Sequence, residues 1–352
     1  MSGTHSALIL AGGRGERFWP WSRPERPKQL LPLGPRGRTL LAATFERALS
    51  LVPADHVVVI TASALIPEVR RECPGAVVVG EPVPRNTAPA IAAASAWFPD
   101  DAAFSVMWAD HMIDDQAAFT ADLKRAFAIA EREHVLVTCG VPATRPDVNL
   151  GYIRRGAPFG DRAFKVAAFE EKPDAERARQ WLASGECLWN IGIFVWRRGV
   201  FMEALAAGRP VLAKAFRDFA FDGTPAGFQA RLADLFPRLE SVSVDHAVLE
   251  SARNAVMIEA SFDWDDLGSW SAWARHQPRD PRGNVRHGAT EVLDCDRCVV
   301  VGEGGLVAAF GLQDMVVVQA HGATLVCPVE RSEQLRTVSE AVRARTEPGG
   351  GS

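Results

Sequence analysis

The chain of 352 residues lacks the features that mark several specialised classes of protein. No apolar run approaches the roughly 20 residues that a membrane-spanning helix needs. The amino-terminal MSGTHS has neither a basic segment nor a long apolar segment, so no secretory signal is visible. The formal net charge of −4, with mixed signs, argues against a general surface for nucleic acid or anionic membrane. We therefore expect no membrane and no nucleic acid among its partners.

Cysteine is also scarce, and its spacing excludes two further classes. The six cysteines do not follow the framework of a small secreted domain held by disulfides. Cys295 and Cys298 form the only close pair, and no second such pair or nearby pair of histidines completes a zinc site. The pattern predicts a reduced, cytoplasmic protein.

The composition that remains is typical of a soluble globular protein, with 47% hydrophobic and 23% charged residues. Short apolar runs at 7–11, 56–61 and 76–79 indicate buried strands, and 39–51 has the apolar spacing of a helix. Strands that alternate with helices predict an α/β fold with a doubly wound, mostly parallel, Rossmann-like sheet. Ligands of such sheets bind at the carboxyl ends of the strands.

Residues 278–284, PRDPRGN, are the clearest domain boundary in the chain, because they are rich in proline and glycine. Short β-rich runs follow, among them 298–301 and 306–310, and their turns are too closely spaced for intervening helices. This spacing predicts a small β-solenoid or sheet. We expect a larger domain over 1–278 and a small domain over 284–345.

A glycine-rich turn directly follows the first apolar run. Glycine allows a backbone to turn sharply or approach a ligand, and successive N–H groups in such a turn can bind an anion. Three cations follow, and prolines between them prevent one continuous helix, so we expect the cations to converge. The residues are Gly12, Gly13, Arg14, Gly15, Arg17 and Lys28. They predict a polyphosphate site. Neither GxxxxGK[ST] nor GxGxxG is present, and an ordinary α/β glycine turn is the alternative.

A second candidate is Asp110, which follows the apolar run 103–109. A carboxylate at the carboxyl end of a parallel strand lies where ligands bind, whereas burial alone would favour an apolar residue there. The alternative is that Asp110 caps the helix expected at 117–131.

Several separated segments are together more specific than any one of them. They are AGGRGERFWPWSRPERPKQLLPL at 11–33, EPVPRNTAP at 81–89, DH at 110–111, GYI at 151–153, FEEKP at 169–173, WNIG at 189–192 and WDDLGSW at 264–270. In this order they resemble the motifs of nucleotidyltransferases that make sugar nucleotides, in the version carried by mannose-1-phosphate guanylyltransferases.

The resemblance implies a GT-A-like nucleotidyltransferase domain followed by a left-handed β-helix-like domain that makes homodimer contacts. The implied reaction joins GTP and α-D-mannose 1-phosphate into GDP-mannose and diphosphate, with Mg²⁺ as cofactor. The implied partners are therefore GTP, a sugar 1-phosphate and a second copy of the chain.

The same resemblance implies roles for residues at the matching positions. Arg17, Lys28 and Asp110 are implied to be catalytic, and Asp110 and Asp266 are implied to bind the metal. The implied nucleotide-binding residues are Leu10, Ala11, Gly12, Gly13, Arg14, Gly15, Glu81, Arg85, Asn86, Thr87 and Asp110. The implied sugar-phosphate-binding residues are Gly151, Glu171, Lys172 and Asn190.

Some of these residues also have a purely structural explanation. Helix-start chemistry explains Asn86 and Thr87, and an exposed charged turn explains the Glu-Lys-Pro segment at 171–173. The family pattern favours Asp266 over the nearby Asp263 and Asp265 as the metal ligand. For Glu81 the chemistry is specific, because one carboxylate can accept hydrogen bonds from both the N1–H and the exocyclic amine of guanine, a donor pair that adenine lacks.

One loop departs from the family pattern. Residues 147–150 read DVNL where the family usually has Glu-Thr-Gly-Tyr, although Gly151, Tyr152 and Ile153 remain. This loop borders the sugar pocket in the family. Transfer to another hexose or heptose 1-phosphate therefore stays open, as do another nucleotide and a non-catalytic relative that binds sugar nucleotides.

Overall fold

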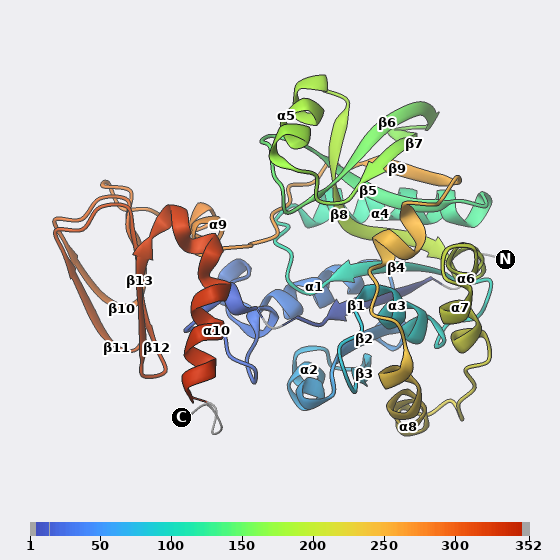
Figure 1. Cartoon of the computed structure of the whole chain (residues 1–352), viewed down its shortest axis with the longest axis horizontal. Helices are drawn as coiled ribbons and strands as arrows, with labels where there is room; N and C mark the ends of the chain where they lie inside the picture. The colour runs from blue at the N-terminus through green and yellow to red at the C-terminus, as the bar shows by residue number, and fades with distance from the viewer. Residues whose placement is uncertain (1–4, 14, 347–352) are drawn as a thin grey trace. The chain divides into compact units, whose positions relative to one another are not determined.

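The protein is described by a computed structural model that covers residues 5–13 and 15–346. Its contacts divide the chain into two compact units, which we describe one at a time (Figure 1). The larger unit runs to Gly12 and continues over 41–109 and 113–264, and the smaller comprises 13–40, 110–112 and the chain from Asp265 onward. The glycine-rich segment thus groups with the C-terminal strands. The division along the sequence at 278–284 stays a prediction.

The larger unit is built on one mixed sheet with the strand order β3-β2-β1-β4-β8-β5-β9-β7-β6. The strands are β1 (Ser6–Ala11), β2 (Val57–Ala62), β3 (Val77–Glu81), β4 (Ala103–Trp108), β5 (Leu136–Pro142), β6 (Gly151–Gly160), β7 (Ala163–Glu170), β8 (Cys187–Arg197) and β9 (Ala255–Glu259). β3, β2, β1 and β4 pair in parallel, as do β5 and β9, while β8 runs antiparallel between β4 and β5. The predicted α/β class is confirmed, and the parallel part carries the predicted strands 7–11, 56–61 and 76–79.

Helices connect and cover these strands. They are α1 (Leu40–Leu49), α2 (Ile66–Glu72), α3 (Thr87–Ser95), α4 (Gln116–Arg132), α5 (Ala175–Ser184), α6 (Arg198–Gly208), α7 (Pro210–Arg217) and α8 (Pro225–Leu235). Asn86 caps the alanine-rich α3, since its side chain accepts a hydrogen bond from the N–H of Thr87. Asp115 caps α4 through the N–H of Ala118 at 2.9 Å, so the alternative role of Asp110 as that cap is wrong.

The core of the larger unit lies between the sheet and its helices. β1 is buried along its whole length, and Phe104 and Phe194 of the neighbouring strands are fully buried. Trp196 stacks on Phe201 of α6 with ring centroids 5.1 Å apart. Burial on both faces explains why the parallel strands read as continuous apolar runs rather than alternating ones.

The smaller unit contains a sheet of β10 (Val285–Leu293), β11 (Val299–Phe310), β12 (Met315–Ala320) and β13 (Ala323–Pro328). β10, β11 and β12 pair in parallel, and β12 and β13 form an antiparallel hairpin. The expected strands 298–301 and 306–310 are one strand, β11, whose pairing with β10 shifts register between Gly288 and Thr290. The unit also holds α9 (Trp270–Arg275) and α10 (Leu335–Thr346).

A second core joins the glycine-rich segment to this sheet. Trp21 is fully buried and stacks on Trp270 of α9, with ring centroids 5.9 Å apart. Both belong to a cluster that includes Val299 of β11 and Val316 of β12. The segment after the first strand is therefore held by tryptophans and valines far along the chain.

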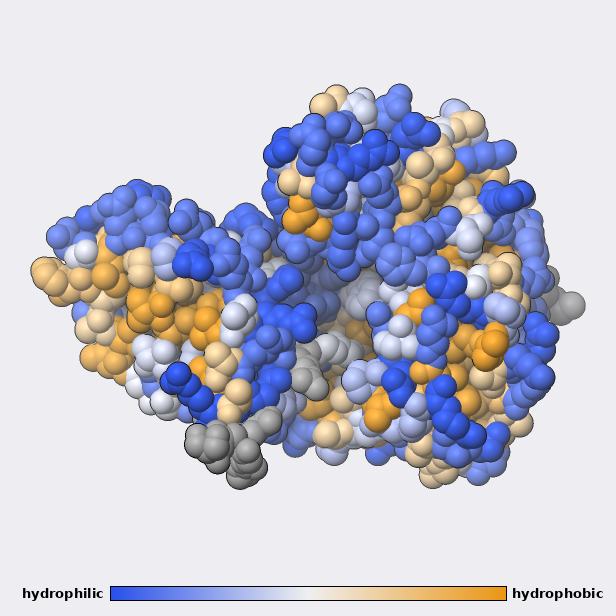
Figure 2. Space-filling view, in the orientation of Figure 1, coloured by the Kyte–Doolittle hydropathy of each residue, from blue (hydrophilic) through white to orange (hydrophobic). Residues whose placement is uncertain are grey.

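The outer surface of the β10–β13 sheet is apolar (Figure 2). Its exposed large apolar side chains include Leu293, Leu306 and Phe310, and Phe310 is 75% exposed. Among the described residues, no helix has the length and apolar character needed to cross a membrane.

Candidate functional site

In the smaller unit, the glycine turn and Lys28 are in close contact. Gly13 and Gly15 have φ angles of 99° and 62°, the left-handed region that favours glycine. A Cβ on Gly15 would lie 2.4 Å from the main-chain nitrogen of Lys28, so any side chain there would displace one of the two segments. Arg14 lies outside the described residues. The sequence therefore needs glycine at 15 to bring Lys28 against the turn.

Lys28 links three segments that are far apart in the sequence. Its ammonium donates a hydrogen bond to Asp110 Oδ2 at 2.8 Å and another to the main-chain oxygen of Asp266 at 2.5 Å. The Lys28 side chain is only 10% exposed, while that of Asp110 is 37% exposed. Burial of a lysine requires a fixed anionic partner, because an unpaired ammonium is costly to remove from water. The Lys28–Asp110 pair is therefore charged, and its carboxylate is partly exposed to solvent.

The pKa of Asp110 is lowered in spite of its surroundings. Removal of the carboxyl group from water raises its pKa, but the positive charges of Lys28 and His111 and the hydrogen bond from Lys28 outweigh that effect. Asp110 is thus held as a carboxylate at neutral pH, the form in which it can bind a cation.

Asp266 and Arg17 both lie against Gly268. A Cβ on Gly268 would be 2.9 Å from Asp266 Oδ2 and 3.3 Å from a guanidinium nitrogen of Arg17. The backbone N–H of Gly268 donates to Asp266 Oδ1 at 3.3 Å. The smaller unit therefore brings together all four of the sequence-predicted residues Arg17, Lys28, Asp110 and Asp266.

The two neighbouring carboxylates are occupied by structural contacts. Asp263 accepts hydrogen bonds from the N–H groups of Asp114 and Asp115, with the shorter to Asp115 at 2.9 Å. Asp265 forms an ion pair with Arg275 at 2.7 Å. Burial raises the pKa of Asp265, but hydrogen bonds from His276 and Arg275 lower it to about 2.

In the larger unit, the ends of β1 and β3 bring Gly12 and Glu81 together. A Cβ on Gly12 would be 3.6 Å from Glu81 Oε2. Burial raises the pKa of Glu81 to about 7, because removal from water disfavours the charged carboxylate. A half-buried carboxyl group with a raised pKa at the carboxyl edge of parallel strands is typical of a ligand site.

The other residues implied to bind the nucleotide in the larger unit have structural roles. Leu10 and Ala11 are buried in β1, where Ala11 accepts a hydrogen bond from Thr61. Arg85 donates to the main-chain oxygens of Phe236 and Pro237. Thr87 Oγ1 accepts the N–H of Val244 at 2.8 Å, in addition to the capping by Asn86 noted above. Their contact with a nucleotide stays a prediction.

The four residues implied to bind the sugar phosphate lie together in the larger unit. A Cβ on Gly151 would be 2.6 Å from Glu171 Oε2 and 3.4 Å from Asn190 Cβ, so the glycine lies directly against both side chains. Lys172 forms an ion pair with Glu171 at 2.9 Å, and its side chain is 61% exposed while that of Glu171 is 13% exposed. Strands β6 and β8 and the turn after β7 position this cluster.

Asp245 also belongs to this cluster, and none of the sequence motifs given above includes it. It begins a π-helical turn over Asp245–Leu249, and its Oδ1 accepts a hydrogen bond from Asn190 Nδ2 at 3.0 Å. The hydroxyl of Thr138 in β5 donates a hydrogen bond to Asn190 Oδ1 at 3.2 Å. Burial and the nearby Glu171 raise the pKa of Asp245 to about 6.

The divergent loop is tied to the same strand. The N–H of Asp147 donates to the hydroxyl of Tyr152 at 2.8 Å, and Asp147 in turn accepts the N–H of Asn149. Tyr152 is fully buried. The Tyr152 hydroxyl and the Asp147 carboxylate therefore hold the loop 147–150 through hydrogen bonds, although the loop lacks the residues that the family usually carries.

Comparisons with known proteins connect these features to a family. The model of the family described as "Nucleotidyl transferase" matches residues 6–282. Over 349 residues the chain is 37% identical to the mannose-1-phosphate guanylyltransferase of Escherichia coli, in a match that covers 96% of this chain and 73% of that protein. The chain belongs to the nucleotidyl transferase family. The resemblance stated from the motifs is confirmed, and with it the expectation of an enzyme.

Further comparisons extend the likeness to the smaller unit and to solved structures. A "MannoseP isomerase/GMP-like beta-helix domain" matches residues 290–342, which confirms the β-helix-like character of the C-terminal strands. The xanthan biosynthesis protein XanB of Xanthomonas campestris pv. campestris (strain B100) is 36% identical over 96% of this chain and 73% of its own length. A structure from Thermus thermophilus, described as a mannose-1-phosphate geranyltransferase, superposes with a TM-score of 0.87 at 32% identity, over 98% of this chain and all of that one.

Proposed function

We propose that this nucleotidyl transferase joins GTP and α-D-mannose 1-phosphate into GDP-mannose and diphosphate. The observation that carries the proposal is the buried Lys28 ammonium, seated between the Asp110 carboxylate and the main chain of Asp266. It belongs to a chain similar to a protein named mannose-1-phosphate guanylyltransferase. Cations beside a pair of carboxylates are suited to a nucleoside triphosphate, and the cluster of Glu171, Asn190 and Asp245 is suited to sugar hydroxyls.

The reaction needs no general base. A sugar phosphate is mostly dianionic at neutral pH, so one of its oxygens can attack the α-phosphorus of GTP directly. The new bond joins that oxygen to the α-phosphorus, and the bond from this phosphorus to the β-phosphate bridging oxygen breaks. Its electron pair leaves with diphosphate. Catalysis then rests on positioning of the two anions and on stabilisation of the charge that builds up around the phosphorus.

The residues of the chain divide these tasks. Lys28 and Arg17 stabilise the transferring phosphoryl group and the departing diphosphate. Lys172, with its exposed ammonium, holds the incoming sugar phosphate, and Glu171 accepts hydrogen bonds from sugar hydroxyls. Glu81 accepts the paired donors of guanine, for which its carboxyl group must be ionised.

The residues also suit a magnesium ion. No group of three or more His, Cys, Asp or Glu side chains arranged to hold a metal occurs among residues 5–13 and 15–346. Mg²⁺ does not require such a group, since it keeps several waters and binds one or two carboxylates together with substrate phosphates. Asp110 and Asp266 provide those hard oxygens, and the ammonium of Lys28 already lies on Asp110. When bound there, Mg²⁺ would neutralise part of the triphosphate charge.

We also propose that two copies associate through the apolar outer surface of β10–β13. Exposed residues such as Leu306 (73%) and Phe310 (75%) form an apolar surface of a kind that monomers rarely expose. The proposed place of action is the cytoplasm, where the chain's six free cysteines would stay reduced.

The test is diphosphate release from a matrix of GTP, ATP, UTP and dTTP with mannose, glucose and heptose 1-phosphates. GTP with mannose 1-phosphate should give the highest kcat/KM. A higher value with another sugar would favour the second candidate, the same transfer to a different hexose or heptose 1-phosphate, for which the divergent loop 147–150 is the reason. No turnover with intact GTP binding would favour a non-catalytic relative.

A further inference from the structure

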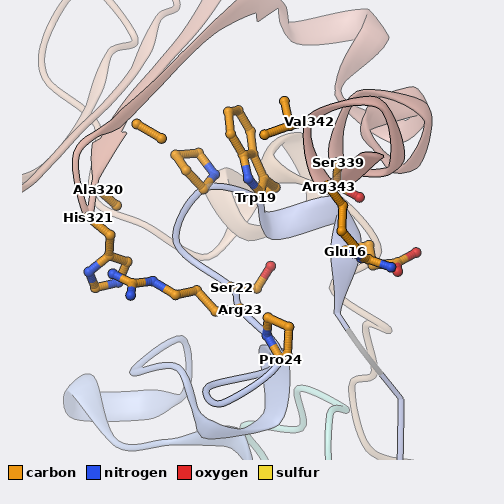
Figure 3. A pocket seen from close by; sticks show the side chains of 12 residues that line it. Glu16, Trp19, Ser22, Arg23, Pro24, Ala320, His321, Ser339, Val342 and Arg343 are labelled. Carbon is orange, nitrogen blue, oxygen red and sulfur yellow. The ribbon is translucent and has the colours of Figure 1, made fainter. Parts of the chain in front are cut away.

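The smaller unit contains a cavity that the proposed reaction does not use. Its volume is about 540 Å³, within the range of small-molecule sites. Its walls come from the glycine-rich segment (Glu16 to Pro24), the turn between β12 and β13, and α10. Figure 3 shows side chains from all three segments around it.

One side of this cavity carries two exposed polar side chains, Arg23 and His321. In Figure 3 the Arg23 side chain reaches toward the imidazole of His321. Both residues are exposed, and neither side chain has a hydrogen-bond or ion-pair partner among the described residues. On the other side, Arg343 forms an ion pair with Glu16 at 2.7 Å. The charges of Arg343 and Glu16 offset each other, so the guanidinium of Arg23, with the imidazole of His321 beside it, makes this side of the cavity suited to an anion.

The turn that carries His321 does not require a histidine. His321 and Gly322 form the two-residue connection of the β12–β13 hairpin, with φ angles of 56° and 80°. Positive φ at both positions is typical of a type I′ turn, which favours Asn or Asp before Gly. A histidine here gives the turn no advantage over asparagine. It does place an imidazole opposite Arg23.

Apolar residues also line the cavity, among them Trp19, Pro20 and Val342 of α10. Figure 3 shows the Trp19 indole beside Val342. An indole face binds a planar base or the apolar face of a sugar ring, and guanidinium and imidazole groups bind phosphate. The cavity thus combines a surface for a ring with donors for a phosphate.

The cavity is connected to Lys28 through the segment that forms its wall. Ser22, which lines the cavity, donates a hydrogen bond from its hydroxyl to the main-chain oxygen of Gly15 at 2.7 Å. Gly15 is the residue packed against the backbone of Lys28. A molecule held against Trp19 and Ser22 therefore contacts the same loop that positions Lys28.

We propose that this cavity is an effector site for a phosphate ester of a small ring compound, a mononucleotide or a sugar phosphate. Arg23 and His321 bind the phosphate, and Trp19 with its neighbouring prolines binds the ring. Occupancy changes the rate of nucleotidyl transfer through the Ser22–Gly15–Lys28 contacts. The rate effect rests on the proposed function, and the binding does not.

The test is calorimetric titration of the full chain with AMP, glucose 6-phosphate and inorganic phosphate. The variants are the double substitution R23Q/H321N and, as a matched control, R217Q, which removes an exposed arginine of the larger unit. Asparagine suits the turn at 321, so the double variant should keep its fold and its basal kcat. We expect at least one ester to bind wild type and R217Q equally, and R23Q/H321N about tenfold more weakly or worse. That ester should also bind wild type more tightly than inorganic phosphate does, and which ester binds decides between a nucleotide and a sugar source.

The rate of transfer gives the second readout. The bound ester should change kcat of wild type and R217Q and leave that of R23Q/H321N unchanged. Equal binding to wild type and R23Q/H321N, or no binding of any probe at millimolar concentration, would overturn the site. Binding without a change in kcat would overturn the link to Lys28. Selective binding by a protein that makes no GDP-mannose would refute the proposed function and leave the binding site standing.

Discussion

The raised pKa of Glu81 leads to a quantitative prediction about nucleotide choice. In the free protein this carboxyl group titrates at about 7, compared with 4.5 for an ordinary glutamate. Only the ionised form accepts both the N1–H and the amine of guanine, so binding of guanine must keep the proton off. From the proton equilibrium, affinity for guanine should rise roughly 25-fold between pH 5.5 and pH 7.5 and then level off.

The phosphates of GTP also titrate in this range, and ATP corrects for them because it carries the same triphosphate. The quantity to measure is therefore the ratio of GTP to ATP affinity by equilibrium titration at several pH values. In wild type this ratio should rise with pH by roughly the factor given above. In Glu81→Gln it should be small and independent of pH, since an amide offers one acceptor and does not titrate. A flat ratio in wild type, or the same rise in the variant, would refute the assignment.

The stability of the free protein gives an independent control on the pKa itself. The carboxyl group ionises near 4.5 in the unfolded chain and near 7 in the folded one. Its contribution to the free energy of unfolding is therefore intact below pH 4.5 and falls by about 3 kcal/mol as pH rises through 7. The free energy of unfolding of Glu81→Gln, taken relative to wild type, should therefore be higher at pH 8 than at pH 5. Parallel stability curves for the two proteins would show that the carboxyl group is not shifted.

Three further predictions concern the other parts of the account. Asp110→Asn and Asp266→Asn should each lower kcat by orders of magnitude with the fold intact, whereas Asp263→Asn should have a mild effect because Asp263 accepts only structural hydrogen bonds. Initial rates at saturating Mg²⁺ measure both effects, and a severe loss in Asp263→Asn with a mild one in Asp266→Asn would place the metal ligand three residues earlier. Asp245→Asn should raise KM for the sugar 1-phosphate several-fold and leave KM for GTP unchanged, because its carboxyl group orients Asn190; equal changes in both values would assign it a general structural role. Truncation after Gly283 should give a monomeric or aggregating protein by light scattering, and a stable dimer would refute the proposed interface.

The sequence predicted some of the buried strands of the larger sheet and missed another. The apolar run at 7–11 could be recognised because a strand buried on both faces has no polar alternation, and Asp110 could be recognised because a carboxylate ends such a run. Strand β9 at 255–259 was not predicted. It contributes a short stretch whose pairing partners, β5 and β7, lie far away in the sequence.

The motifs singled out residues that the structure brings together, such as Lys28 and Asp110, but they did not predict contacts that depend on packing. Lys28 and Asp110 carry their charges wherever the chain places them, so the motifs were enough to select them. The role of Asp245 depends on a hydrogen bond from Asn190, 55 positions earlier, which no local pattern reveals. Arg85 shows the opposite case, since its motif predicts a ligand contact and the structure binds its guanidinium to the carbonyls of Phe236 and Pro237.

The stoichiometry of the products distinguishes transfer of a guanylyl group to mannose 1-phosphate from any other use of GTP. Purified full-length protein with Mg²⁺, GTP and α-D-mannose 1-phosphate should yield GDP-mannose and diphosphate in equal amounts, followed by ³¹P NMR. Lys28→Met should abolish both products together, because the ammonium that lies on Asp110 is lost. GTP consumed without GDP-mannose, or GDP-mannose formed at the wild-type rate by Lys28→Met, would contradict the account.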